Sequence, residues 1–254
     1  MLTGKLCMRR SIGLLFCWLP LITSALTIHP WSFSSQHPRH TVSLLFVGDL
    51  ILHPPLQAQG KQHGLRSLWS AALPYFQQAD LACVNLEGPI ATGVDPTGRY
   101  HPNASVWDTH IYTGYPRFNY PPALTHALAK SHLSVISVAN NHTFDRFALG
   151  ADKTVDALSA AKLIPIGIRQ RHHHTPRYRL TRTHGLTLAW IDCTTSTNGM
   201  SDRYHQVLRC NQPQDQRTLL TLIQQLRSRT DGVILLPHWG KQYDFNPTLA
   251  QRQL

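Results

Sequence analysis

Four hydrophobic, strand-like runs, each followed directly by a polar cluster, constrain the fold of this 254-residue chain more than any other feature. The four clusters are Gly48-Asp49, Asn85-Leu86-Glu87, Asn140-Asn141-His142 and His238-Trp239-Gly240. Helical patterns separate the runs, and this alternation predicts an α/β fold with a largely parallel central sheet. Functional sites in such sheets form outside the carboxyl ends of the strands. We therefore expect the four clusters to meet at one edge.

The remaining segments are assigned from their periodicity and turn residues. We expect strands over 41–47, 81–86, 133–139, 164–168 and 232–237, helices over 65–78, 121–130, 148–161 and 214–229, and a hairpin of strands 178–183 and 187–192. The segment 88–120 is rich in Gly, Pro, Asn and Tyr, which is typical of a long functional loop. The three histidines at 172–174 are predicted to lie in a solvated loop rather than in a metal site.

The amino terminus resembles an export signal. A basic start precedes an apolar run over residues 11–26, and Thr23 and Ala25 stand where a cleavage site has small residues. This pattern predicts a signal peptide over residues 1–25, with an uncleaved N-terminal anchor as the alternative. We therefore expect an extracytoplasmic protein, whether periplasmic, secreted or associated with the cell envelope.

The chain is strongly basic. It has 24 Lys and Arg residues against 13 Asp and Glu residues, a formal charge of +11. Removing residues 1–25 removes three basic residues and no acidic ones, which leaves +8. Such a charge attracts polyanions such as an acidic polymer or an anionic membrane surface. Nucleic acid is not expected as a partner, because the chain carries an export pattern and no nucleic-acid-binding motif.

Three of the five cysteines lie beyond the predicted signal. Cys83 stands in an apolar run and is predicted to be a buried thiol. Cys193 and Cys210 flank a polar stretch, and in an oxidising compartment these two could form a disulfide.

The four polar clusters share one kind of chemistry. They supply carboxylate and amide oxygens and imidazole nitrogens, which are ligands for divalent metal ions. A single cluster has an ordinary structural explanation, because Asp and Asn commonly start turns and cap helices. Four clusters after four strands are hard to explain as capping, and the pattern favours a shared metal site.

The motifs resemble those of the CapA family, also called the PGA-cap family, a branch of the calcineurin-like metallophosphoesterases. The matching residues are Gly48-Asp49, the NLEGPI motif at 85–90, the ANNH motif at 139–142 with Asp145, and the HWG motif at 238–240. The resemblance covers about residues 42–254. It implies a metallophosphoesterase-like α/β/β/α sandwich over residues 41–254, in an exported protein of capsule-polymer synthesis or export, the polymer being of the poly-γ-glutamate type.

The resemblance also implies a metal-ligand set. Asp49 would bind a first divalent ion, Glu87 would bridge, and Asn141 and His238 would bind a second ion. The spacing does not choose among Mn, Fe, Zn and Mg, nor between one ion and two.

Further site residues follow from the same motifs. The resemblance makes His142 the general acid for the leaving oxygen or a stabiliser of transition-state charge, with Asp145 orienting its ring. Asn140 and Asn85 would contact substrate or orient the metal ligands. His53 is a weaker candidate for that role, and a simple loop histidine is the better interpretation.

The chain departs from the family pattern in two places. Gln242 stands where family members usually have an acidic residue soon after HWG, and a GHHPHV-like segment that completes the family site does not occur before Leu254. The resemblance thus implies a domain incomplete at its carboxyl end, with weak binding of a single metal ion.

Two functions stay open on the sequence. One is a metal-dependent phosphoesterase-like hydrolase acting on a phosphoester substrate. The other is a non-catalytic component of the capsule machinery that binds acidic polymer and has a degenerate metal site. In either case, other capsule proteins and the membrane surface are expected partners.

Overall fold

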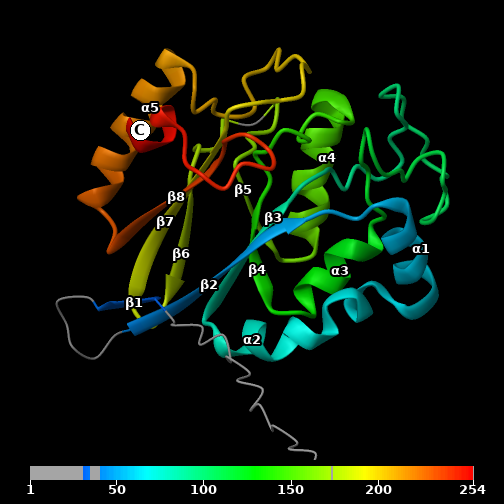
Figure 1. Cartoon of the computed structure of the whole chain (residues 1–254), viewed down its shortest axis with the longest axis horizontal. Helices are drawn as coiled ribbons and strands as arrows, with labels where there is room; N and C mark the ends of the chain where they lie inside the picture. The colour runs from blue at the N-terminus through cyan, green and yellow to red at the C-terminus, as the bar shows by residue number, and fades with distance from the viewer. Residues whose placement is uncertain (1–30, 35–40, 173, 254) are drawn as a thin grey trace, which may run out of the picture.

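A computed structural model describes residues 31–34, 41–172 and 174–253 (Figure 1). The predicted signal peptide over residues 1–25 lies outside the described residues. The described chain forms two β-sheets with helices on their outer faces. In Figure 1, α5 lies at the left and α3 and α4 lie toward the right, with the strands between them.

The first sheet has five strands. Its order is β1 (Trp31–Ser34), β2 (Thr41–Leu50), β3 (Leu81–Leu86), β4 (Leu133–Ser137) and β5 (Ile164–Ile166). β1 runs antiparallel to β2, and β2 to β5 are parallel to one another. The carboxyl ends of β2, β3 and β4 therefore lie at one edge, as the alternation of elements predicts.

The second sheet has three strands and includes the predicted hairpin. Its order is β6 (Arg179–Thr183), β7 (Leu186–Thr194) and β8 (Gly232–His238). β6 is antiparallel to β7, and β8 is parallel to β7. His184 and Gly185 make the hairpin turn with φ of 49° and 82°, a left-handed pair that matches the twist of the strands.

Helices connect most of the strands. They are α1 (Pro54–His63), the 3₁₀ helix η1 (Leu65–Ala72), α2 (Leu73–Gln78), α3 (Ala123–Ala129), α4 (Phe147–Ala160), α5 (Pro213–Arg227) and α6 (Leu249–Gln253). Between β3 and α3 runs the predicted long loop, where Val94 and Tyr100 form an isolated bridge. No helix among residues 31–34, 41–172 and 174–253 is long and apolar enough to cross a bilayer.

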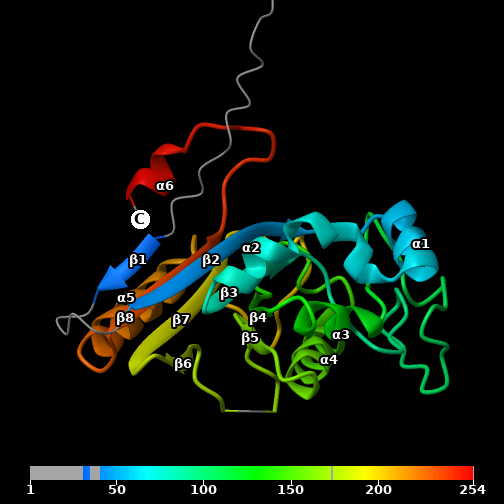
Figure 2. The same cartoon turned by 90° about the horizontal axis from the view of Figure 1, so that it is seen from below.

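Three hydrophobic clusters define the layers. The first packs one face of the five-stranded sheet against η1, α2, α3 and α4. The second lies between the two sheets, and the third lies between the three-stranded sheet and α5. Along β7 the side chains alternate, because Trp190 joins the middle cluster while Ala189 and Ile191 join the outer one. The predicted α/β/β/α layer order is confirmed (Figure 2).

Several predicted boundaries are wrong. The strand predicted to end at Val47 continues to Leu50, because a register shift between Val47 and Asp49 lets parallel pairing resume with Asp49 opposite Asn85. The single helix predicted over 65–78 is instead the 3₁₀ helix η1 followed by α2, and within η1 Trp69 leaves helical geometry at φ −133° and ψ 25°. α1, which begins at Pro54, is an element that the periodicity did not predict.

The cysteine predictions are confirmed. Cys193 and Cys210 form a disulfide, with their Cα atoms 5.6 Å apart. Cys83 is a buried free thiol on β3. Burial, together with the nearby Asp192 carboxyl, raises the pKa of Cys83 to about 12, so the thiol stays protonated.

Candidate functional site

Three of the predicted metal ligands converge where the two sheets meet. Asp49 near the end of β2, Glu87 just after β3 and His238 at the end of β8 each offer a ligand atom, and these atoms all lie within 4.8 Å of one another. Glu87 is buried, His238 is half-buried and Asp49 is exposed. The first sheet thus supplies the two carboxylates and the second sheet supplies the imidazole.

A cleft of about 410 Å³ opens onto these ligands. Its lining residues are Asp49, Glu87, Asn141, Thr195, Ser196, Asn198, His238, Trp239, Gly240, Lys241 and Gln242. All four polar clusters therefore contribute at least one residue to this cleft. A ligand of the size of a phosphate group has room beside the carboxylates.

The main chain around Glu87 is held by Tyr120, at the end of the long loop, and by Leu50 on β2. The Tyr120 hydroxyl donates to the Glu87 carbonyl oxygen over 2.7 Å, and the Glu87 N–H donates to the Leu50 carbonyl over 3.2 Å. Gly88 follows with φ of 139°, and a Cβ atom there would lie 2.8 Å from Phe118 and Tyr120. Glycine at this position is therefore required both by conformation and by the close approach of two aromatic side chains.

The electrostatics of the cluster suit a cation. Burial and the neighbouring charge of Asp49 raise the pKa of Glu87 to about 7, because ionisation would place a second negative charge in a poorly hydrated place. Burial lowers the pKa of His238, although Asp49 opposes that shift. A neutral imidazole beside two carboxylates is the form that binds a divalent metal ion.

Two asparagines connect the metal-ligand candidates to one another. The Asn85 side-chain amide donates to Asp49 Oδ1 over 2.8 Å and lies 3.3 Å from His238 Nδ1. Asn140 donates in turn to Asn85 Oδ1 over 3.0 Å and to the Leu86 carbonyl over 2.8 Å. These contacts place Asn85 and Asn140 behind the carboxylate–imidazole cluster, where they orient its members.

Asn141 has an oxygen available for a ligand. Its Oδ1 is buried and has no hydrogen-bond partner among the residues that the structure describes. Leaving a buried amide oxygen without a partner costs free energy unless a ligand satisfies it. Since Asn141 lines the same cleft as Asp49, Glu87 and His238, the four donors together fit a divalent metal ion.

His142 and Asp145 form a buried pair beside the cluster. His142 Nδ1 and Asp145 Oδ2 are 2.7 Å apart, and the same Asp145 oxygen accepts the Phe118 N–H over 2.7 Å. Because a carboxylate accepts, Nδ1 carries the proton and Nε2 is left as the ring nitrogen for the cleft. Nε2 lies 4.0 Å from Glu87 Oε1, and the ring packs edge-on against Phe118.

The remaining candidates differ in whether they reach the cleft. His53 is exposed and is not among the cleft-lining residues, and its ring packs against Phe118 at a centroid distance of 5.5 Å. Gln242, which replaces the acidic residue of the family pattern, lines the cleft. His172 and His174 lie outside the metal-ligand group found among the described residues.

The sequence patterns do not predict four of the residues that line the cleft, which are Thr195, Ser196, Asn198 and Lys241. Asn198 lies within 3.4 Å of His142 Nε2 and accepts from the Asn141 amide over 3.4 Å. A signal was present, since the polar stretch after Cys193 is a fifth polar cluster that follows a hydrophobic strand.

The fold and the cleft define a two-sheet α/β protein with a carboxylate–imidazole centre. The family model "Bacterial capsule synthesis protein PGA_cap" matches residues 43–254, and the chain belongs to this family. The PGA biosynthesis protein CapA of Bacillus subtilis (strain 168) is 22% identical over 249 residues, which cover 94% of this chain and 61% of that protein. The capsule biosynthesis protein CapA of Bacillus anthracis is 20% identical over 246 residues, covering 93% of this chain and 57% of that protein.

The chain thus spans about 60% of the length of these two relatives. Among solved structures, a phosphatase from Mycoplasma pneumoniae aligns with a TM-score of 0.40 and 14% identity, covering 84% of this chain and 57% of that one.

Proposed function

We propose that this chain is an exported capsule-synthesis protein whose cleft binds a divalent metal ion and hydrolyses a phosphoester. The observation that carries the proposal is the convergence of Asp49, Glu87 and His238 within 4.8 Å, beside the buried His142–Asp145 pair. Family membership supports the capsule role. The polymer is proposed to be of the poly-γ-glutamate type, as the name of the Bacillus subtilis relative suggests.

Each site residue has a role in this proposal. Asp49, Glu87, His238 and Asn141 would hold the ion, which when bound supplies Lewis acidity and lowers the pKa of water. Asp145 accepts from Nδ1 of His142 and thereby presents Nε2 to the cleft. When both ring nitrogens carry a proton, His142 can give the Nε2 proton to the leaving oxygen or stabilise the negative charge that develops in the transition state.

Export rests on two observations. The amino terminus has the basic and apolar pattern of a signal, and Cys193 pairs with Cys210. Disulfides persist mainly in oxidising compartments outside the cytoplasm. The exported chain, with a formal charge of +8 without residues 1–25, would then meet an anionic polymer or the membrane surface.

The test is hydrolysis of bis(p-nitrophenyl) phosphate and p-nitrophenyl phosphate, with and without added Mn²⁺. We expect metal-dependent release of nitrophenol that falls by about 100-fold or more in His142→Gln, because the proton donor is lost. The matched control is His110→Gln, an exposed histidine in the long loop, which should keep the parent rate. Absence of metal-dependent hydrolysis would refute the catalytic proposal and favour a non-catalytic, polymer-binding component with a degenerate metal site.

A further inference from the structure

The segment from Thr194 to Met200 contributes one wall of the cleft. It follows β7 directly, and Thr195, Ser196 and Asn198 all line the cleft. Asn198 is exposed, so its amide is accessible to a ligand. These three residues line the same cleft as Asp49, Glu87 and His238, while Met200 packs against the first hydrophobic cluster.

The segment has a defined conformation. Asn198 and Gly199 both have positive φ, at 49° and 76°, and Asn is among the few non-glycine residues that adopt such angles readily. The Thr194 hydroxyl donates to the Ser196 carbonyl over 2.9 Å, and the Thr197 hydroxyl donates to the Met200 carbonyl over 2.7 Å. These local bonds fix the turn that points Asn198 at the cleft.

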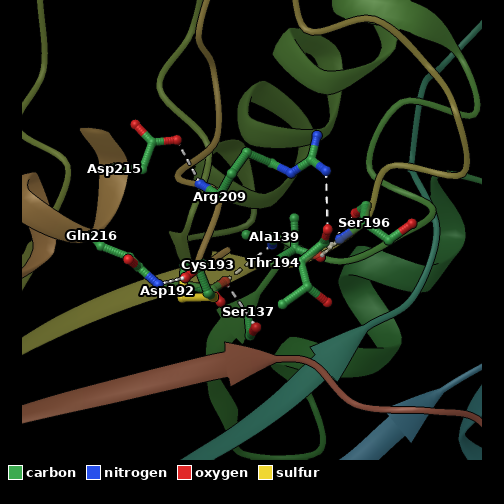
Figure 3. Close-up of a disulfide and its surroundings, with 11 residues drawn as sticks. Ser137, Ala139, Asp192, Cys193, Thr194, Ser196, Arg209, Asp215 and Gln216 are labelled. Atoms are coloured by element: carbon green, nitrogen blue, oxygen red, sulfur yellow. Dashed lines mark hydrogen bonds between the residues drawn. A yellow bond between two sulfur atoms is a disulfide. The ribbon is translucent and has the colours of Figure 1, made fainter. Parts of the chain in front are cut away.

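The segment is also braced from both sides. Arg209 donates to the Thr195 carbonyl over 2.9 Å and to the Thr197 hydroxyl over 3.3 Å. Arg209 precedes Cys210, whose disulfide with Cys193 ties the brace to the end of β7 (Figure 3). On the cleft side, the Thr195 N–H donates to the His238 carbonyl over 3.1 Å, which joins the segment to a metal-ligand candidate.

Asn198 differs from the other asparagines of the site. The amides of Asn85 and Asn140 are engaged at 2.8–3.3 Å behind the metal-ligand candidates. Asn198, by contrast, makes two contacts of 3.4 Å, one from its amide nitrogen to His142 Nε2 and one from its oxygen to Asn141. Hydrogen bonds this long are weak, and an amide NH₂ carries two donors. A ligand oxygen can therefore use a donor of Asn198 at little cost.

We propose that Asn198 is a substrate-contacting residue whose amide N–H binds a phosphorus-bound oxygen held beside His142. The ligand class is a phosphoryl group, because an uncharged N–H donor next to a divalent metal site matches an oxygen that keeps partial negative charge. This inference rests on the proposed function, since it takes the same cleft as the place of reaction. It adds a donor from the segment after β7 to the metal-ligand candidates of the same cleft.

The experiment measures binding of inorganic phosphate and of Mn²⁺ by calorimetry, in the parent protein and three variants. Asn198→Asp keeps the size and the positive φ but replaces the donor with a charge, and we expect phosphate affinity to fall by about tenfold or more. Asn198→Ala removes the donor without adding charge, and we expect a loss of about fivefold. Asn103→Asp, an exposed position in the long loop that does not line the cleft, should bind phosphate as the parent does.

Phosphate binding is measured both with and without Mn²⁺, so the two proposals fail separately. Loss of phosphate affinity at Asn198 with Mn²⁺ affinity preserved supports the assignment. Unchanged phosphate affinity in both Asn198 variants, or a parent that binds no phosphate in either state, overturns it. A parent that binds phosphate through Asn198 but binds no Mn²⁺ refutes the metal-dependent function and leaves the Asn198 contact standing.

Discussion

The two halves of the site are built differently. The half that follows β3 and β4 is interior, since Glu87, Asn140, His142 and Asp145 are at most 6% exposed. The other half is open, because Asp49 is exposed and His238 is half-buried at the end of β8. The interior half is fixed by short hydrogen bonds such as the one of 2.7 Å from His142 to Asp145.

Because one half of the site is buried and the other is exposed, substitutions in the two halves should affect different properties, protein stability in the first and ligand affinity in the second. Removing an interior group leaves a buried partner unsatisfied, so the folded protein should lose stability even when no ligand is present. Removing a side chain of the open half leaves few buried polar groups without a partner, so we expect it to change ligand affinity rather than the free energy of unfolding. We therefore expect the same kind of substitution to lower the free energy of unfolding in the interior half and to lower ligand affinity in the open half.

The largest expected contrast is between two aspartates. Asp145→Ala should lower the free energy of unfolding by about 2–5 kcal/mol, because the Phe118 N–H and the His142 ring both lose a buried acceptor. Asp49→Ala should change it by less than about 1 kcal/mol, since the carboxylate is exposed. Urea unfolding in metal-free buffer measures both, and equal losses would contradict the division into two halves.

The second prediction concerns the wall of the open half. The disulfide closes a loop with a sequence separation of 17. Replacing Cys193 and Cys210 together by serine should lower the free energy of unfolding by about 3 kcal/mol, because the unfolded chain regains loop freedom. Denaturant titration of the double variant against the oxidised parent checks this value. A difference near zero would mean that the cross-link adds nothing to the braced wall.

The third prediction is that the free energy of unfolding depends on pH through Asp192, which holds the end of β4 beneath the interior half. Asp192 on β7 accepts from Ser137 Oγ over 2.8 Å and from the Val138 and Ala139 N–H groups, and so joins the second sheet to the end of β4 (Figure 3). Burial raises its pKa to about 8, although these hydrogen bonds oppose the shift.

The sign follows from linkage. Because the folded pKa lies above the unfolded one near 4, the unfolded state releases its proton first. The contribution of Asp192 to stability is therefore full below about pH 4 and declines as pH rises toward 8. Asp192→Asn should lack this pH-dependent contribution. The difference in free energy of unfolding between parent and variant should therefore shrink or reverse between about pH 4 and pH 8. A pH-independent difference would contradict the assignment.

Much of the fold could be predicted because hydrophobic periodicity is local. The five strands that carry or support the site, β2, β3, β4, β7 and β8, were all expected within a few residues. The errors arose where tertiary structure overrides local pattern. The local sequence does not predict the register shift at Gly48 or the break in helical geometry at Trp69.

The site was predictable to the extent that its residues follow strands. The sequence placed Asp49, Glu87, Asn141 and His238 at strand ends, and the structure brings them to one cleft, while their roles remain predictions. Asn198 was not predicted as a site residue. The polar stretch after β7 was a signal for the segment, but the orientation of Asn198 depends on a turn held by Arg209, and that contact between residues distant in the sequence follows no local pattern.

The central claim is that Asp49, Glu87 and His238 form a divalent-metal site, and Mn²⁺ titration of the metal-free protein tests it most directly. Glu87→Gln preserves shape but removes the buried carboxylate, and Asp156→Asn makes a similar change at an exposed position on α4. We expect the parent and Asp156→Asn to bind Mn²⁺ alike, and Glu87→Gln to lose about 100-fold or more in Mn²⁺ affinity. Equal Mn²⁺ affinity in the parent and in Glu87→Gln, or no binding by the parent, would contradict it.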